Sequence, residues 1–380
     1  MKEYTLRDVL IRQKEAITVE DDAEYKRITI KMNGNGVLLR DEVIGDAIGT
    51  KRQFLVSSDQ FVLSKIDARN GAFGIVPKSC DGAIITGNFW TFDVNSELAD
   101  VKYLDFMSKT PEFKDFCIVA SEGTTNRKYL DENKFLDKRI LLPELAEQKK
   151  VVAKILKFKN KIELARKIRN EILSDLYVLL NSTFHKLIEG AVYKPMSEVA
   201  PIVRRQIEIT VDGEYPELGA RSFGKGIFHK PTLIGAELDW QKLYTVHSGD
   251  LVLSNIKAWE GAIAAAGDND HGRVGSHRYI TCVPVEGVTT ANFLAFYLLT
   301  QEGIEQVQAA SPGSADRNRT LAMKRLEKIK VPVPDYDKQL WFNQLQSYVE
   351  KIKQAQSENE IELEALMPSI LDKAFKGELV

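Results

Sequence analysis

The sequence predicts an α+β protein built from two similar globular domains, each followed by a long helix. The first reason is an internal repeat: residues 54–72 align with residues 244–262, and nine of the nineteen pairs are identical. The second reason is that each copy ends in a long stretch of apolar residues at heptad spacing. The repeat is offset by 190 residues, far more than the roughly 20–50 residues of a solenoid repeat, so it indicates duplicated domains.

The duplication runs through almost the whole chain and predicts an internal pseudo-twofold relation. The same offset joins residues 34–36 to residues 224–226, and one inserted residue then pairs Gln148 with Gln339. We therefore expect globular domains at 1–142 and 191–333, and helices at 143–190 and 334–380.

Short strands, turns and short helices are expected inside the globular domains. Strand-like runs rich in β-branched and aliphatic residues occupy 60–66, 250–256 and 278–283, and a helical pattern covers 292–300. This mixture is typical of an α+β domain.

Each long helix should begin sharply and carry an apolar seam. Pro143 with Glu144, and Pro334 with Asp335, place a proline and an acid where the first turn of a helix favours them. The predicted seam residues are Ile155, Phe158, Ile162, Ile172 and Leu176 in the first helix, and Val349, Ile352, Leu363, Leu366 and Ile370 in the second.

Charge favours pairing of these two helices with each other. Residues 144–189 hold ten basic and six acidic residues, a net of +4, and residues 335–380 hold five and nine, a net of −4. A helix of about 40 residues would be about 60 Å long, which suits a spacer between two domains.

Composition indicates a soluble two-domain chain. The 380 residues are 44% hydrophobic with a formal net charge of −2, and no apolar run approaches the roughly 18 residues of a membrane span. We expect no membrane partner and a cytoplasmic location. Cys80, Cys117 and Cys282 are scattered, so we expect buried thiols and neither disulfides nor a zinc site.

Motifs for catalysis are weak. The segment 219–226 resembles a phosphate loop, but Gly226 stands where a Ser or Thr must reach the metal. No Pro-Pro pair is present, which excludes the Asn/Asp-Pro-Pro-aromatic motif of amino-methyltransferases, and the five histidines lack metal-ligand spacing. The sequence therefore predicts a non-catalytic chain without a cofactor or metal of its own.

Two related domains held at a fixed separation suit double-stranded DNA read at two half-sites. Four segments, in their order along the chain, carry a resemblance to a known family: residues 141–150, residues 251–254 before Gly261, residues 331–334 with Gln339, and residues 370–379. Together they resemble the specificity subunit of type I restriction-modification systems, over the whole chain.

The resemblance implies two target recognition domains and an antiparallel pair of coiled-coil spacer helices that set the gap in a bipartite DNA site. It further implies docking of two methyltransferase subunits and, usually, of restriction and translocase subunits. S-adenosylmethionine and ATP would then be bound by those partners. The second copy departs from the pattern at residues 335–338, where Asp-Tyr-Asp-Lys replaces Glu-Leu-Ala-Glu.

Basic and amide side chains in loops are the candidates for contacting DNA, because Arg, Asn and Gln read base edges whereas Lys, Ser and Thr mostly hold phosphates. In the first domain they are Lys51, Arg52, Lys65, Arg69, Asn70, Thr124, Thr125, Asn126, Arg127 and Lys128. In the second they are Arg221, Lys225, Lys257, Arg278, Ser314, Arg317, Asn318 and Arg319. We expect the segments 123–128 and 313–319 to contact phosphates.

Two other readings remain open at the level of sequence. One is a specificity subunit for a methyltransferase-only or other phage-defence system. The second is a duplicated coiled-coil adaptor that scaffolds proteins without reading DNA.

Overall fold

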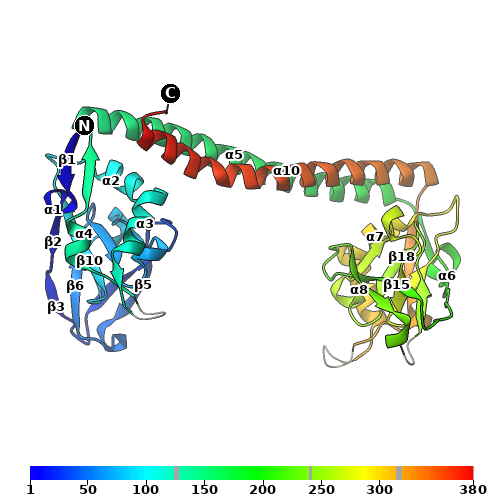
Figure 1. The fold of residues 1–380 in the computed structure, drawn as a ribbon. Coiled ribbons are helices and arrows are strands. Elements are labelled where there is room, and N and C mark those ends of the chain that lie inside the picture. The colour runs from blue at the N-terminus through cyan, green and yellow to red at the C-terminus, as the bar shows by residue number, and fades with distance from the viewer. Residues whose placement is uncertain (124–127, 239–241, 314–318, 380) are drawn as a thin grey trace. The chain divides into compact units, whose positions relative to one another are not determined.

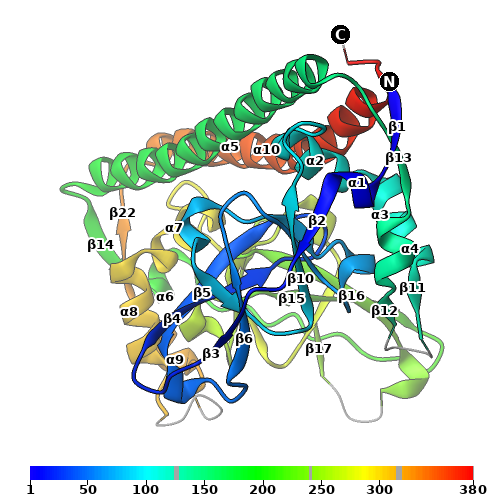
Figure 2. The same ribbon diagram turned by 90° about the vertical axis from the view of Figure 1, so that its left-hand side faces the viewer.

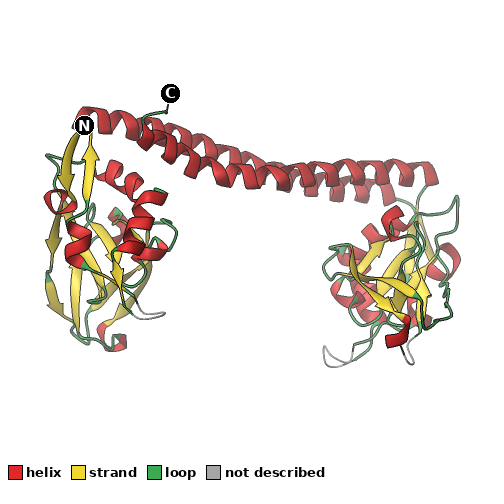
Figure 3. Ribbon diagram, viewed as in Figure 1, coloured by secondary structure: helices red, strands yellow, loops and turns green. Residues whose placement is uncertain are grey.

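The computed structural model describes residues 1–123, 128–238, 242–313 and 319–379 (Figure 1). The chain forms two compact units, each with its own sheets and helices (Figure 3). Unit 1 comprises Met1–Arg169 and Gln356–Val380, and unit 2 comprises Asn170–Ala355. The predicted α+β class is confirmed.

Unit 1 is shown facing the viewer in Figure 2. Its strands are β1 (Lys2–Thr5), β2 (Leu10–Gln13), β3 (Ala16–Thr18), β4 (Glu24–Ile30), β5 (Val37–Ile44), β6 (Arg52–Val56), β7 (Phe61–Ser64), β8 (Phe73–Ile75), β9 (Ala83–Ile85), β10 (Phe89–Val94), β11 (Ser121–Glu122), β12 (Tyr129–Leu130) and β13 (Arg139–Leu142). Its short helices are α1 (Leu6–Val9), η1 (Gly45–Ala47), η2 (Ala68–Asn70), η3 (Lys78–Cys80), α2 (Val101–Ser108), α3 (Pro111–Val119) and α4 (Glu132–Leu136).

Unit 2 repeats this order with fewer strands. They are β14 (Val192–Pro195), β15 (Glu214–Ala220), β16 (Ile227–Ile234), β17 (Leu243–Thr245), β18 (Leu251–Ser254), β19 (Ile263–Ala265), β20 (Val274–Ser276), β21 (Tyr279–Cys282) and β22 (Lys330–Val333). The short helices are α6 (Met196–Val199), η4 (Gly235–Glu237), η5 (Ala258–Glu260), η6 (Asp268–Asp270), α7 (Ala291–Leu299), α8 (Gln301–Ala310) and α9 (Met323–Leu326).

The sheets of the two units share one topology. The strand order β3-β6-β9-β4-β5 in unit 1 corresponds to β17-β20-β15-β16 in unit 2, and β10-β7-β8 corresponds to β21-β18-β19. In each unit one parallel bridge interrupts otherwise antiparallel pairing, between Arg27 and Ile84 in unit 1 and between Glu217 and Val274 in unit 2. Both members of the second pair lie 190 residues after those of the first, so the sequence repeat is a structural repeat.

A turn held by backbone hydrogen bonds explains why certain glycines recur in both copies of the repeat. Gly71 and Gly261 end the short helices η2 and η5 with positive φ angles of 76° and 84°, a conformation that glycine adopts without a Cβ clash. The amide of Gly34 donates to the carbonyl of Gly71 at 2.9 Å, and the amide of Gly224 donates to that of Gly261 at the same distance.

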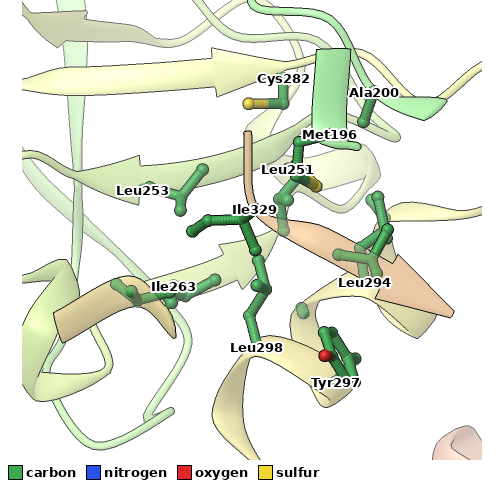
Figure 4. Close-up of a cluster of buried hydrophobic side chains, with 14 of the residues drawn as sticks. Met196, Ala200, Leu251, Leu253, Ile263, Cys282, Leu294, Tyr297, Leu298 and Ile329 are labelled. Atoms are coloured by element: carbon green, nitrogen blue, oxygen red, sulfur yellow. The ribbon is translucent and has the colours of Figure 1, made fainter. Parts of the chain in front are cut away.

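Alternating strand residues and the inner faces of short helices form the core of each unit. In unit 2, Leu251 and Leu253 of β18 meet Ile263 of β19 and Leu298 of α7, all at most 1% exposed (Figure 4). Cys80, Cys117 and Cys282 are each buried and unpaired, as the sequence predicts.

Two long helices complete the fold: α5 spans Leu145–Ile188 and α10 spans Tyr336–Lys376. In unit 1 the early part of α5, with Ile155, shares a core with the end of α10, with Leu371. In unit 2 the end of α5 contacts the beginning of α10, and the rings of Phe184 and Phe342 lie 5.4 Å apart. The pairing within both units is therefore antiparallel.

A buried glutamine ties each long helix to its globular part. The fully buried Gln148 donates from Nε2 to the carbonyls of Leu98 and Pro143 at 2.8 and 2.9 Å, and its Oε1 accepts from the amide of Asp100. Gln339, its counterpart in the repeat, donates to the equivalent carbonyls of Val288 and Pro334, and its Oε1 accepts from the hydroxyl of Thr289 at 2.9 Å.

The seam between the long helices differs from the predicted heptad frame at three positions. Ile155, Ile162 and Val349 are buried as expected, but Ile172, Ile352 and Leu366 remain 40%, 41% and 42% exposed. The remaining predicted seam residues, Phe158, Leu176, Leu363 and Ile370, are half-buried. Apolar residues next to the seam follow the same heptad spacing. Spacing alone therefore assigned three exposed residues to the seam.

The long helices also carry a polar contact at Arg169 of α5, a half-buried residue. Its guanidinium pairs with Glu360 of α10, and Arg166 lies 3.8 Å from the same carboxylate. These contacts agree with the opposite net charges of the two helices. In the described part of the chain, no helix is long and apolar enough to cross a membrane.

Candidate nucleic-acid interface

The turn after β7 brings two predicted segments of unit 1 together. The carbonyl of Lys65 accepts a hydrogen bond from the amide of Leu130 at 2.8 Å, which places Lys128 next to the β7 turn in the fold. Asn70 donates from Nδ2 to Asp67 at 3.1 Å, and Arg69 is half-buried beside it. The half-buried side chains of Lys65, Arg69, Asn70 and Lys128 therefore come from chain segments that lie next to each other.

Lys51 and Arg52 differ in their surroundings. The ammonium group of Lys51 pairs with Asp21 and donates to the carbonyl of Gly45 at 2.9 Å, which fixes the turn after β5. Arg52, at the start of β6, has an exposed side chain. Both residues therefore stay predicted DNA contacts, with Lys51 held by Asp21 and Arg52 exposed.

In unit 2, Trp259 holds two predicted cations. The Lys257 ammonium lies 5.3 Å from the centre of its ring system and the Arg319 guanidinium 4.9 Å, both within cation–π range. The indole N–H donates to the carbonyl of Ile256 at 3.0 Å, which fixes the ring. Lys257 also pairs with Glu260 at 2.6 Å.

The other described candidates of unit 2 lie on exposed turns. Arg221 stacks over Phe228 at 5.0 Å, and Lys225 lies 5.9 Å from the ring of Phe223. Arg278 is exposed just before β21. Seven candidates lie outside the described residues: Thr124, Thr125, Asn126, Arg127, Ser314, Arg317 and Asn318.

A hollow of about 360 Å³ on the five-stranded sheet of unit 1 adjoins the β7 turn. Arg27, Arg40 and Asp67 are among the side chains that line it. Arg27 forms a two-pronged pair with Asp41 of the neighbouring strand, with Nε–Oδ1 and Nη2–Oδ2 distances of 2.7 Å each. This hydrogen bonding raises the pKa of Arg27 and lowers that of Asp41.

Unit 2 has a corresponding charged pair on its sheet. Lys230 of β16 contacts Glu217 of β15, with an Nζ–Oε1 distance of 2.9 Å, and lies 5.5 Å from the ring of Tyr279. Burial lowers the pKa of Lys230, but the hydrogen bond to Glu217 and the charges of both neighbours outweigh burial, so the net shift is upward.

Neither of these two ion pairs on the sheets, called the sheet pairs below, was predicted from the sequence. Arg27 and Lys230 lie in strands that show alternating apolar and polar residues. Neither residue is in a loop or belongs to a basic cluster, so neither was selected as a candidate. Only the register of β4 with β5, and of β15 with β16, brings each cation to its acid. An arginine or lysine inside a strand, opposite an acid in the next strand, is the signal that could have located them.

No group of three or more metal-ligating side chains occurs within the described ranges. The surfaces on both units instead consist of cations held by acids or aromatic rings, an arrangement suited to phosphates and base edges.

Comparison with known proteins agrees with this chemistry. Residues 1–174 match the family model of the type I restriction modification DNA specificity domain. No curated protein matches the chain by sequence.

Two solved structures share the fold along the full length of the chain. The HsdS subunit from Thermoanaerobacter tengcongensis is 20% identical with a TM-score of 0.63, and the match covers 100% of this chain and 97% of that one. A chain from a structure of complex assembly and conformational transition in the type I R-M system is 20% identical with a TM-score of 0.69, covering 100% and 98%. Residues 1–174 therefore belong to the family of the type I restriction modification DNA specificity domain, and the chain as a whole shares the fold of these two structures.

Proposed function

We propose that this subunit reads a bipartite site on double-stranded DNA, one half-site with each unit. The observation that carries the proposal is the structural duplication combined with different charged side chains at equivalent positions. A shared framework with unlike polar residues is what two domains reading different short sequences require.

The proposal extends to partner subunits. Two methyltransferase subunits would dock on this chain, bind S-adenosylmethionine and modify adenine on each strand, and restriction and translocase subunits would bring ATP-dependent chemistry. Large apolar side chains more than half exposed on the long helices support docking. They are Leu164 and Ile361 in unit 1, and Tyr177, Val178, Trp341 and Tyr348 in unit 2.

DNA affinity would come from local cations, because the net charge of the whole chain is −2. Arg52 and Lys65 in unit 1, with Arg221 and Lys225 in unit 2, would serve as phosphate or base contacts. The seven candidates in 124–127 and 314–318 remain part of this proposal.

Mapping of methylated adenines tests the function directly. A host carrying this gene with its neighbouring genes is compared with the same host lacking only this gene. We expect a bipartite motif that disappears on deletion. If methylation by a demonstrably active neighbour is unchanged, the chain does not guide a methyltransferase and the adaptor reading is favoured.

A phage-plating assay on the same pair of hosts separates full restriction from a methyltransferase-only or other defence system. Guided methylation together with loss of phage restriction on deletion indicates a complete restriction system. Guided methylation without any restriction indicates the methyltransferase-only alternative.

A further inference from the structure

The two sheet pairs lie in equivalent hairpins, but not all of their members are equivalent. Arg27 and Glu217 share the parallel-bridge position of β4 and β15. Lys230 is the counterpart of Arg40, which lies 3.5 Å from Asp41, and not of Asp41 itself. An acid therefore replaces the central-strand cation in unit 2, and the paired cation of that unit lies on the neighbouring hairpin strand, about 4.8 Å away.

Each cation keeps hydrogen-bond donors that its acid does not use. Arginine has five N–H donors, and Asp41 takes one from Nε and one from Nη2 of Arg27. The Nη1 group of Arg27 keeps N–H donors that Asp41 does not accept, and the Arg27 side chain is 29% exposed. Lys230 has three donors and is 27% exposed, whereas its acid Glu217 is only 14% exposed.

The acids fix the cations in orientation. A two-pronged carboxylate contact holds the guanidinium plane of Arg27, and the Tyr279 ring with Glu217 holds the ammonium group of Lys230. A flexible side chain held in this way loses less conformational freedom on binding. Arg27 also lines the hollow beside the β7 turn, a position that a purely structural ion pair would not need.

We propose that Arg27 and Lys230 are specificity-determining residues that each read a guanine, one in each half-site. Guanine presents the O6 and N7 acceptors in the major groove, and arginine and lysine are the side chains that pair with them. The displacement of the cation by one strand places the guanine at a different position relative to the framework of each unit. This inference rests on the proposed function and adds the base and the side chains that read it.

Arg27→Gln and Lys230→Gln test the inference in the subunit co-expressed with its neighbouring methyltransferase genes. Methylated-adenine mapping should show that Arg27→Gln relaxes one guanine position in one half-site and leaves the second half-site unchanged. Lys230→Gln should relax one position in the opposite half-site. Discrimination at the affected position should fall roughly 10-fold to 100-fold. Arg139→Gln, which changes an exposed arginine of β13 in the same unit, is the matched control and should leave the motif unchanged.

The outcomes separate this inference from the proposed function. If the unaltered subunit yields a bipartite motif and Arg27→Gln leaves every position intact, the inference is wrong and the function stands. If the unaltered subunit guides no methylation, both fail.

Complete loss of methylation in Arg27→Gln with an unchanged melting temperature also contradicts the inference, since a base contact affects one position. If Arg27→Gln melts early, the double variant Arg27→Gln with Asp41→Asn removes the acid that would otherwise be left unpaired. That variant should still relax the single guanine, and an intact motif would overturn the proposal.

Discussion

Gln148 and Gln339 show how a single buried side chain attaches a long helix to a globular part. Each makes three hydrogen bonds, two of them to carbonyls that precede the helix or lie in an adjacent loop. A buried amide with its hydrogen bonds satisfied fixes one orientation, which a leucine of similar size would not do.

We predict that Gln339→Leu destabilises unit 2 by about 1–3 kcal/mol, because it leaves the carbonyls of Val288 and Pro334 buried without a donor. Urea unfolding followed by tryptophan fluorescence measures the change. Gln344→Leu, an exposed glutamine on the same helix, is the control and should change stability by less than about 0.5 kcal/mol. Equal effects of both variants would show that the buried hydrogen bonds are unimportant.

The buried thiols give a prediction on pH. Burial raises the pKa of Cys117 to about 12, and burial with the charges of Asp250 and Glu327 raises that of Cys282 to about 12. A thiol whose pKa is raised by folding stabilises the fold fully below the unfolded value of 9.0, and this contribution is lost as the pH rises from there to the folded value of about 12. Native protein at pH 8 should therefore leave Cys117 and Cys282 unmodified by a thiol reagent, and both should react in urea. Rapid labelling of either thiol in the native protein would show that it is not enclosed.

At the scale of elements, strand and helix positions could be predicted from local pattern. The runs 250–256 and 278–283 contain β18 and β21, and the run 292–300 closely matches α7. The heptad spacing likewise predicted both long helices. The seam frame was less predictable because α5 is apolar on more than one flank, with Leu164, Ile168 and Ile172 following one another at four-residue steps outside the buried seam.

Two isoleucines of α5 test the corrected frame. Ile155→Ala removes a fully buried side chain and should cost about 2–5 kcal/mol, including the cavity it leaves. Ile172→Ala removes one that is 40% exposed and should cost clearly less. Thermal unfolding of the two variants side by side measures the difference. A loss of stability at Ile172 as large as that at Ile155 would show that Ile172 lies in the seam, as the sequence predicted.

Candidate interface residues were predictable only where the signal is local. Basic residues in turns, such as Lys65 and Lys225, can be recognised from the sequence. The sheet pairs could not be, because the partner acids of Arg27 and Lys230 come 14 and 13 residues away and meet them through strand register. Lys51 was recognised from its basic segment, but its ion pair with Asp21 could not be, because Asp21 lies 30 residues away.

At the scale of the whole molecule, duplication implies modular reading. Each unit has its own sheets and core, and α5 and α10 pass through both units. If the helices set the gap in the DNA site, their length should set the number of bases between half-sites.

Deletion of one heptad from each helix tests this spacing. Removal of residues 163–169 and 357–363 keeps the antiparallel seam in phase and shortens each helix by about 10 Å, equivalent to about three base pairs. We expect methylation at a motif with unchanged half-sites and a gap shorter by about three bases. An unchanged gap would show that the helices do not act as the spacer.

The most direct test of the central claim, that each unit reads its own half-site, is a domain exchange. Residues 1–142 are replaced by the corresponding domain of a relative with a different known motif, and methylated adenines are mapped in a host expressing the chimera with its partner subunits. We predict that one half-site changes to that of the relative while the second half-site and the gap remain. Simultaneous change or loss of both half-sites in a well-folded chimera would contradict modular reading by the two units.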